Sequence, residues 1–98
     1  MNINKIPQGE ELTVEIEGRL DTSTAPQLEG ELADLAGVKK LVMDFVKLEY
    51  ISSAGLRVLL ATQKRMNAQG EMVITHVNET IMEVFEITGF SDILTIEK

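Results

Sequence analysis

Cysteine is absent from this chain of 98 residues. Its absence excludes disulfide bonds, thiolate catalysis and metal sites built on thiolates. Tryptophan is absent too, and aromatic residues make up only 4% of the chain, so we expect a core of aliphatic side chains. The sequence has 2 prolines and no low-complexity run, which argues against intrinsic disorder.

Basic residues are scarce, because 9 Lys and Arg against 16 Asp and Glu give a formal net charge of -7. This charge argues against nucleic acids and anionic membranes as partners. It permits steering towards a basic protein partner, although acidity also serves simply to keep a protein soluble. No apolar run approaches the roughly 20 residues of a membrane span, and residues 1–5 do not begin a signal peptide. We therefore expect a soluble, cytoplasmic protein.

Catalytic residues are also few. Nothing in the sequence places the single histidine, His76, beside Ser53, and the Gly-x-Ser-x-Gly, phosphate-loop and dinucleotide motifs are missing. One histidine without cysteine is poor support for a metal site. We expect a protein that is not an enzyme and needs no cofactor and no metal; a weak enzyme is the least favoured alternative.

Hydrophobic periodicity predicts one domain over residues 1–98. Residues 12–17 alternate between apolar and polar side chains, as in a strand with one face in water. The apolar run at residues 41–43 indicates a strand near the centre of a sheet or buried on both faces. Strands are expected at residues 1–8, 12–17, 40–46, 71–75 and 93–96, with residues 48–51 as a connector.

Helices are predicted between these strands. Ser23 or Thr24 can cap a helix that includes Pro26 and stops at Gly37. The other two helices are expected at residues 53–67 and from about Asn78 to Gly89. After the opening hairpin, strands alternate with helices, and right-handed crossovers then give parallel pairing. The fold class is therefore α/β, with a mixed four- to five-stranded sheet and helices mainly on one side.

The most distinctive segment is residues 44–57, where a strand, a short loop and the pair Ser52-Ser53 lead into a helix. A helix N-terminus offers free N–H groups and the positive end of the helix dipole, which favour an anionic group such as a phosphate on Ser53. Gly55 permits close approach of another backbone. The simpler interpretation is that Ser52 or Ser53 is only an N-cap.

Residues 50–56, Tyr-Ile-Ser-Ser-Ala-Gly-Leu, resemble the phosphorylation motif of the STAS-domain anti-sigma-factor antagonists. Residues 18–25 are similar to a second segment of that family, a Gly-x-Leu-Asp turn before the first helix. Residues 70–72 and the pair Gly89-Phe90 resemble its later elements, so the likeness covers nearly the whole chain. The resemblance implies a STAS-like fold.

By position, the resemblance assigns the phosphoacceptor role to Ser53. Ser52 stands where the family often has Asp, and it is the second candidate. The resemblance implies a partner-binding set made of Asp21, Thr22, Ser52, Ala54, Gly55 and Arg57. Arg57 could pair with a phosphate on Ser53 or point into solvent, and Asp21 is also a common turn-forming residue. Asp44 is expected either near the phosphorylation site, at the same rim of the sheet, or as an ordinary carboxylate at the strand end.

The resemblance also implies a function. An unphosphorylated antagonist binds a serine-kinase anti-sigma factor and so releases the sigma factor. The kinase then phosphorylates the antagonist, and a separate phosphatase resets it. The alternative is a STAS accessory subunit, for example of a transport complex, that binds its partner constitutively.

Overall fold

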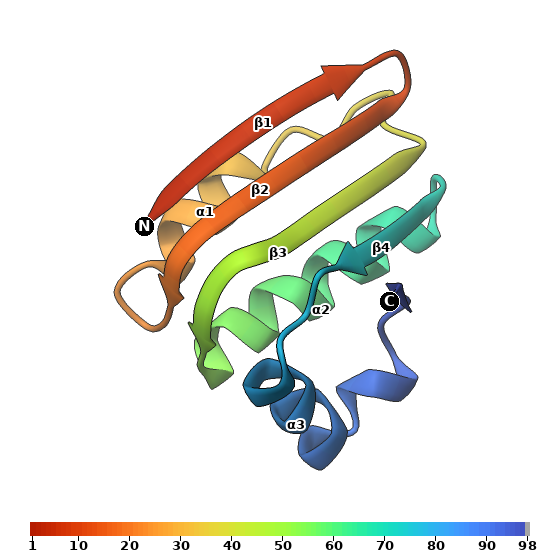
Figure 1. The fold of residues 1–98 in the computed structure, drawn as a ribbon. Coiled ribbons are helices and arrows are strands. Elements are labelled where there is room, and N and C mark those ends of the chain that lie inside the picture. The colour runs from red at the N-terminus through yellow and green to blue at the C-terminus, as the bar shows by residue number, and fades with distance from the viewer. Residues whose placement is uncertain (98) are drawn as a thin grey trace.

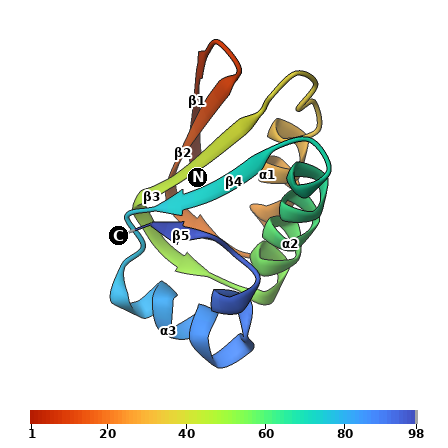
Figure 2. The ribbon, with the colours of Figure 1, turned by 90° about the vertical axis from the view of Figure 1, so that its right-hand side faces the viewer.

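The computed structural model describes residues 1–97, and within them the strands form a five-stranded sheet in the order β1-β2-β3-β4-β5 (Figure 1; β5 is labelled in Figure 2). The elements are β1 (Asn2–Gln8), β2 (Glu11–Leu20), α1 (Ala25–Glu31), β3 (Lys40–Ile51), α2 (Ser53–Asn67), β4 (Glu71–Thr75), α3 (Glu79–Thr88), the 3₁₀ helix η1 (Phe90–Asp92) and β5 (Ile96–Glu97). Strand β1 is antiparallel to β2, and the remaining pairs are parallel. The mixed sheet and the opening hairpin are confirmed.

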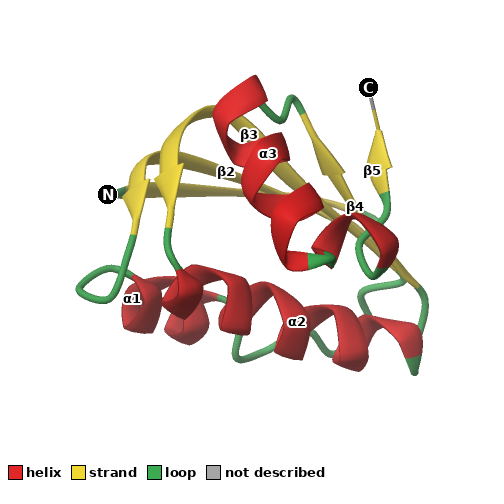
Figure 3. Cartoon of the chain, turned by 90° about the horizontal axis from the view of Figure 1, so that it is seen from below, coloured by secondary structure: helices red, strands yellow, loops and turns green. Residues whose placement is uncertain are grey.

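Helices α1 and α2 cover one face of the sheet, as Figure 3 shows, and α3 lies across the end where β3 stops (Figure 2). The core lies between the sheet and these helices. Val14 and Ile16 of β2 face it and are fully buried, as is Leu59 of α2. On the other face, Glu15 and Glu17 accept hydrogen bonds from side chains of β1. The expected arrangement, with helices mainly on one side, is confirmed.

Strand β3 is longer than predicted, because it runs to Ile51 and includes the residues expected to form a connector. Its register against β2 shifts between Glu15 and Glu17 and again between Gly18 and Arg19. Each shift adds a residue to β3, so the buried positions Phe45, Leu48 and Ile51 are spaced by three instead of two. The connector at residues 48–51 was therefore wrong, whereas the central position of β3 is confirmed.

Strand β2 also extends past its predicted end. Gly18 does not close it, since pairing with β3 continues to Leu20 opposite Ile51. Gly18 has φ of 109°, a value open to glycine at low cost, so the strand bends there without stopping. This extension brings residue 21 to the same sheet rim as the start of α2.

Helix α1 is shorter than predicted, because it ends at Glu31 and not near Gly37. Leu32 and Leu35 are buried as the helical pattern implied, but they lie in irregular chain. Two side chains distant in the sequence satisfy the carbonyls of that segment: Arg65 of α2 donates to Leu32 O and Ala33 O, and Gln69, in the turn after α2, donates to Leu35 O and Val38 O. These bonds from residues more than 30 positions away cannot be recognised in the local sequence.

At the C-terminal end, α3 agrees with prediction at both termini. Asn78 Oδ1 accepts a hydrogen bond from Ile81 N at 2.8 Å, and Gly89 ends the helix with φ of 81°. The last strand is shorter than the predicted residues 93–96, since the amides of Ile93 and Leu94 donate to Phe90 O and continue η1. Pairing with β4 starts only at residue 96.

Candidate functional site

The candidate site lies at the rim where β2 and β3 end side by side (Figure 1). Leu20 pairs with Ile51, and Ser52 N donates to Leu20 O at 2.9 Å. Asp21 follows β2 directly, and Ser53 is the first residue of α2. Two segments about 30 residues apart in sequence thus meet at one edge, as the parallel topology predicts.

The two serines of this rim differ in exposure. Ser53 is exposed. Ser52 occupies the N-cap position of α2 with extended backbone, but its side chain makes no capping hydrogen bond. Its Oγ is buried and has no hydrogen-bond partner among residues 1–97. Of the two serines, only Ser53 is exposed to solvent, and the simple N-cap interpretation fails for the side chain of Ser52.

Gly55 faces inward. A Cβ atom on this residue would lie 2.6 Å from Leu20 Cγ and 2.9 Å from Ile51 Cγ1, closer than carbon atoms pack. The missing side chain lets the first turn of α2 lie against the ends of β2 and β3. The close approach predicted for Gly55 thus occurs within the chain itself, and a contact of Gly55 with a partner remains a prediction.

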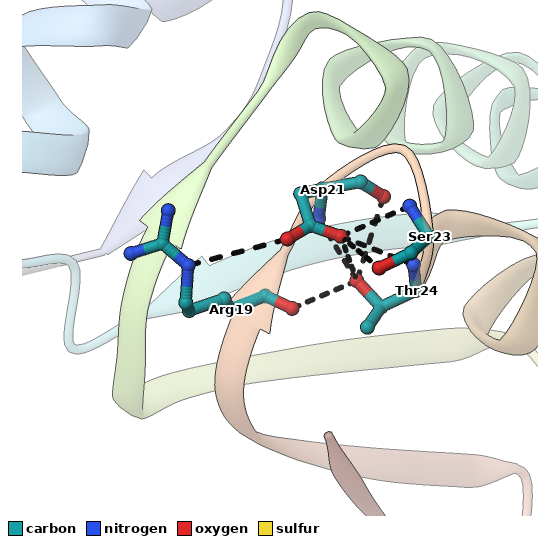
Figure 4. A network of polar contacts seen from close by, with 4 residues as sticks. All are labelled: Arg19, Asp21, Ser23 and Thr24. Carbon is teal, nitrogen blue, oxygen red and sulfur yellow. Dashed lines mark hydrogen bonds and ion pairs between the residues drawn. The ribbon is translucent and has the colours of Figure 1, made fainter.

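The loop after β2 is held by Asp21 (Figure 4). Its Oδ1 accepts hydrogen bonds from Ser23 Oγ at 2.7 Å, Ser23 N at 3.0 Å and Thr24 N at 3.2 Å. These donors, the Ser23 hydroxyl first, lower the pKa of Asp21 below its ordinary value, against a smaller opposing effect of desolvation. Asp21 is therefore a turn-forming residue and a fixed negative charge at the rim.

Thr24 does not cap α1 in the predicted way. It is the N-cap residue, but its side chain makes no capping bond to the helix. Its hydroxyl donates to Arg19 O at 2.7 Å and accepts from Asp21 N at 2.8 Å. Thr24 thus fastens the loop to the end of β2.

Arg19 and Tyr50 add a contact that the sequence interpretation missed. The guanidinium carbon of Arg19 lies 4.3 Å from the centre of the Tyr50 ring, within the range of a cation–π interaction. Arg19 Nε also lies 4.0 Å from Asp21 Oδ2 (Figure 4). Arg19 and Tyr50 are paired because of the second register shift between β2 and β3, and no sequence motif predicts that shift.

A shallow depression of about 240 Å³ beside the rim brings together Thr22, Ala54 and Arg57. Its other lining residues are Ala25, Pro26, Glu29 and Val58. Arg57 is exposed, and within residues 1–97 its guanidinium forms no ion pair. The structure thus gathers three of the predicted partner-binding residues around one concave surface.

Asp44 is not part of this rim. It lies in the middle of β3, four residues before Leu48, and its Oδ1 is 2.9 Å from His76 Nδ1. The same oxygen accepts a hydrogen bond from Val46 N at 3.0 Å, where the first register shift occurs. Both expectations for Asp44, at the rim or at the strand end, were wrong because β3 is longer than predicted.

Residues 1–97 contain no group of three or more His, Asp or Glu side chains placed to hold a metal ion. In the same described part of the chain, no helix is both long enough and apolar enough to cross a membrane.

Comparison with known proteins identifies relatives over nearly the whole length. A family model for the STAS domain matches residues 2–98. The chain is 42% identical over 84 residues to BtrV of Bordetella bronchiseptica, which is named as an anti-sigma factor antagonist; the match covers 83% of this chain and 72% of that protein. It is 30% identical over 101 residues to an anti-sigma-B factor antagonist of Staphylococcus aureus, covering 100% of this chain and 94% of that protein.

Solved structures show the same fold at low sequence identity. A protein from Thermotoga maritima described as an anti-sigma factor antagonist has a TM-score of 0.90 at 18% identity, over 98% of this chain and 86% of that chain. SpoIIAA of Bacillus is 17% identical to this chain. Its unphosphorylated form has a TM-score of 0.78, over 99% of this chain and 88% of that chain. Its phosphorylated form has a TM-score of 0.76, over 99% of this chain and 92% of that chain. A sulfate transporter family protein of Wolinella succinogenes has a TM-score of 0.77 at 20% identity, over 92% of this chain and 75% of that chain. Since the family model covers almost every residue, the resemblance seen in the sequence is confirmed, and the chain belongs to the STAS domain family.

Proposed function

We propose that this protein is an anti-sigma-factor antagonist: a phosphorylation-controlled binding switch that, when unphosphorylated, sequesters a serine-kinase anti-sigma factor. It acts by binding and not by catalysis, and the kinase supplies the nucleotide site. The observation that carries the proposal is the exposed Ser53 beside the buried hydroxyl of Ser52, on the rim shared with Asp21. Curated relatives named as anti-sigma factor antagonists support it.

The covalent step needs only an accessible hydroxyl from this chain. The Ser53 oxygen attacks the γ-phosphorus of ATP, the bond from that phosphorus to the bridging oxygen breaks, and ADP leaves. A base of the kinase takes the hydroxyl proton. Ser52 is a poor acceptor, because its Oγ would first have to leave the interior. Ser53 is therefore the phosphoacceptor in this proposal.

Charge at the rim accounts for the switch. The phosphate adds about -1.5 to -2 at neutral pH, close to Asp21, which its hydrogen bonds hold in the ionised form. A partner surface that accepts one carboxylate must then face and desolvate a much larger negative charge, so binding weakens. No change of fold is needed. SpoIIAA resembles this chain about equally in its two phosphorylation states, which supports that view.

The partner-binding residues divide into two groups. Asp21, Thr22, Ala54 and Arg57 reach solvent at the rim and the adjoining depression, and we assign direct contacts with the kinase to them. Ser52 and Gly55 lie beneath this surface and act by positioning the first turn of α2. A separate phosphatase removes the phosphate and restores binding.

The proposal is tested by titrating a serine-kinase anti-sigma factor of the same organism with wild-type protein, Ser53→Ala and Ser53→Asp. Ser53→Ala should bind like wild type, since it keeps the neutral surface. Ser53→Asp should bind at least tenfold more weakly while remaining folded, because it adds a charge beside Asp21. Ser52→Asp is no substitute control because it buries a charge; Lys64→Gln, on the exposed side of α2, is the matched surface control.

Equal binding by Ser53→Ala and Ser53→Asp would contradict the switch. In that case the constitutive accessory subunit becomes the better interpretation. The likeness to a sulfate transporter family protein is a likeness of fold and does not favour that alternative by itself.

A further inference from the structure

The three arginines of this chain are used differently. The guanidinium of Arg19 lies over the Tyr50 ring. That of Arg65 donates to the carbonyls at the end of α1, at 2.7 and 2.9 Å. Within the described residues, Arg57 has neither a hydrogen bond nor an ion pair from its side chain, although it stands exposed on a well-packed helix. Its charge is thus available to a group that the unmodified protein lacks.

Helix geometry places that charge next to Ser53. Both residues belong to α2 and are four positions apart, so they share one face of the helix. Side chains of a helix lean towards its N-terminus, so a long side chain covers the turn before its own Cα. From position 57 a long side chain can therefore reach the turn that starts with Ser53, and a guanidinium is well suited to bind phosphate oxygens in pairs.

We propose that Arg57 is the intramolecular phosphate-binding residue of the switch and holds the phosphate of phosphorylated Ser53 against the surface of α2. This inference rests on the proposed function. In the phosphorylated state, Arg57 is withdrawn from the partner-binding surface and occupied by the phosphate. Phosphorylation thus removes one cation from the docking surface in addition to adding negative charge.

The surrounding carboxylates do not prevent this pairing. Glu29 lines the same depression as Arg57, but no carboxylate of the described residues lies within ion-pair distance of its guanidinium. Asp21 is already held by donors of its own loop and by Arg19. A phosphate one helical turn away carries more charge than either carboxylate and is the strongest acceptor that Arg57 can reach.

The test uses protein with phosphoserine incorporated at position 53 during translation, so it needs no kinase. The second phosphate ionisation is followed by ³¹P NMR in the otherwise unchanged chain, in Arg57→Gln, in Arg57→Lys and in Lys64→Gln. A bound guanidinium favours the dianion, so Arg57→Gln should raise the phosphate pKa by about 0.3 units or more, from a value near 6. The phosphate pKa of Arg57→Lys should lie between those of the unchanged chain and Arg57→Gln, and Lys64→Gln should leave the phosphate pKa unchanged.

An unchanged phosphate pKa in Arg57→Gln, or an equal shift in Lys64→Gln, would overturn the inference. Because the phosphate is installed directly, this failure would leave the proposed function standing. Conversely, a kinase that never modifies Ser53 would contradict the proposed function without altering the measured pairing of Arg57 with the phosphate.

Discussion

Ser52 and Asn78 occupy the N-cap positions of α2 and α3, both with extended backbone. The Asn78 side chain accepts from Ile81 N and donates to Leu48 O at 3.0 Å, so it ties α3 to β3. The Ser52 hydroxyl is buried and makes no hydrogen bond within the described residues. The same position in a helix therefore stabilises the fold in one case and not in the other.

Substitution by alanine should separate these two caps. Asn78→Ala should lower the free energy of unfolding by about 1–2 kcal/mol, because it removes a true cap and strands a carbonyl. Ser52→Ala should have a free energy of unfolding within about 0.5 kcal/mol of the wild-type value, or above it, because the substitution removes a desolvated hydroxyl that makes no hydrogen bond in the described part of the chain. Urea unfolding of both variants measures this. A loss for Ser52→Ala as large as that for Asn78→Ala would show that its hydroxyl is bonded.

Asp21 makes the stability of the rim dependent on pH. Its pKa in the folded protein is lowered from 3.8 by the donors of Ser23 and Thr24. The ionised form therefore stabilises the fold above the unfolded pKa, and this contribution is lost as pH falls through the lower folded value. Asp21 is about one third exposed, so solvent screening keeps the effect small.

The expected result is a stability gap between wild type and Asp21→Asn that is present at pH 6 and narrows below about pH 4. Urea unfolding at several pH values measures the gap, and Asp34→Asn, in the loop after α1, serves as a carboxylate control. A gap that stays constant or widens in acid would be inconsistent with a lowered pKa at Asp21.

At the scale of elements, the hydrophobic period predicts that a helix or strand is present, but it does not predict where that element ends. The start of α2 and the whole of α3 are predictable because Asn78, Gly89 and the serine pair are local signals. The second half of β3 is not, because two register shifts change the spacing of Phe45, Leu48 and Ile51 from two to three. A spacing of three resembles neither a strand nor a full helix, so it suggests a connector.

Helix α1 depends on a donor from another helix. The segment that directly follows α1 presents Leu32 O and Ala33 O to the Arg65 guanidinium, and a cation at this end of α1 suits the negative end of the helix dipole. Arg65→Ala should lower the free energy of unfolding by about 1–3 kcal/mol, since it leaves the part-buried carbonyl of Leu32 without a partner. Lys64→Ala, the exposed neighbour, should have little effect. Equal losses for the two variants would argue against the bond to α1.

For the whole molecule, the topology assembles the site. Parallel pairing of β2 with β3 brings their carboxyl ends to one rim, so Asp21 and Ser53 could be placed together from the order of elements alone. The Arg19–Tyr50 and Asp44–His76 contacts could not. They depend on strand register and on the positive φ of 58° at His76, which the sequence pattern does not specify.

The most direct test of the switch is to map the phosphate after incubation of the wild-type protein with ATP and a serine-kinase anti-sigma factor of the same organism. Mass spectrometry of peptides spanning residues 48–64 distinguishes Ser52 from Ser53, and Ser53→Ala serves as the control. Exposure of Ser53 and burial of the Ser52 hydroxyl predict a single phosphate on Ser53 and none in Ser53→Ala. Phosphate on Ser52, or incorporation that persists in Ser53→Ala, would contradict the assignment of Ser53 as the switch.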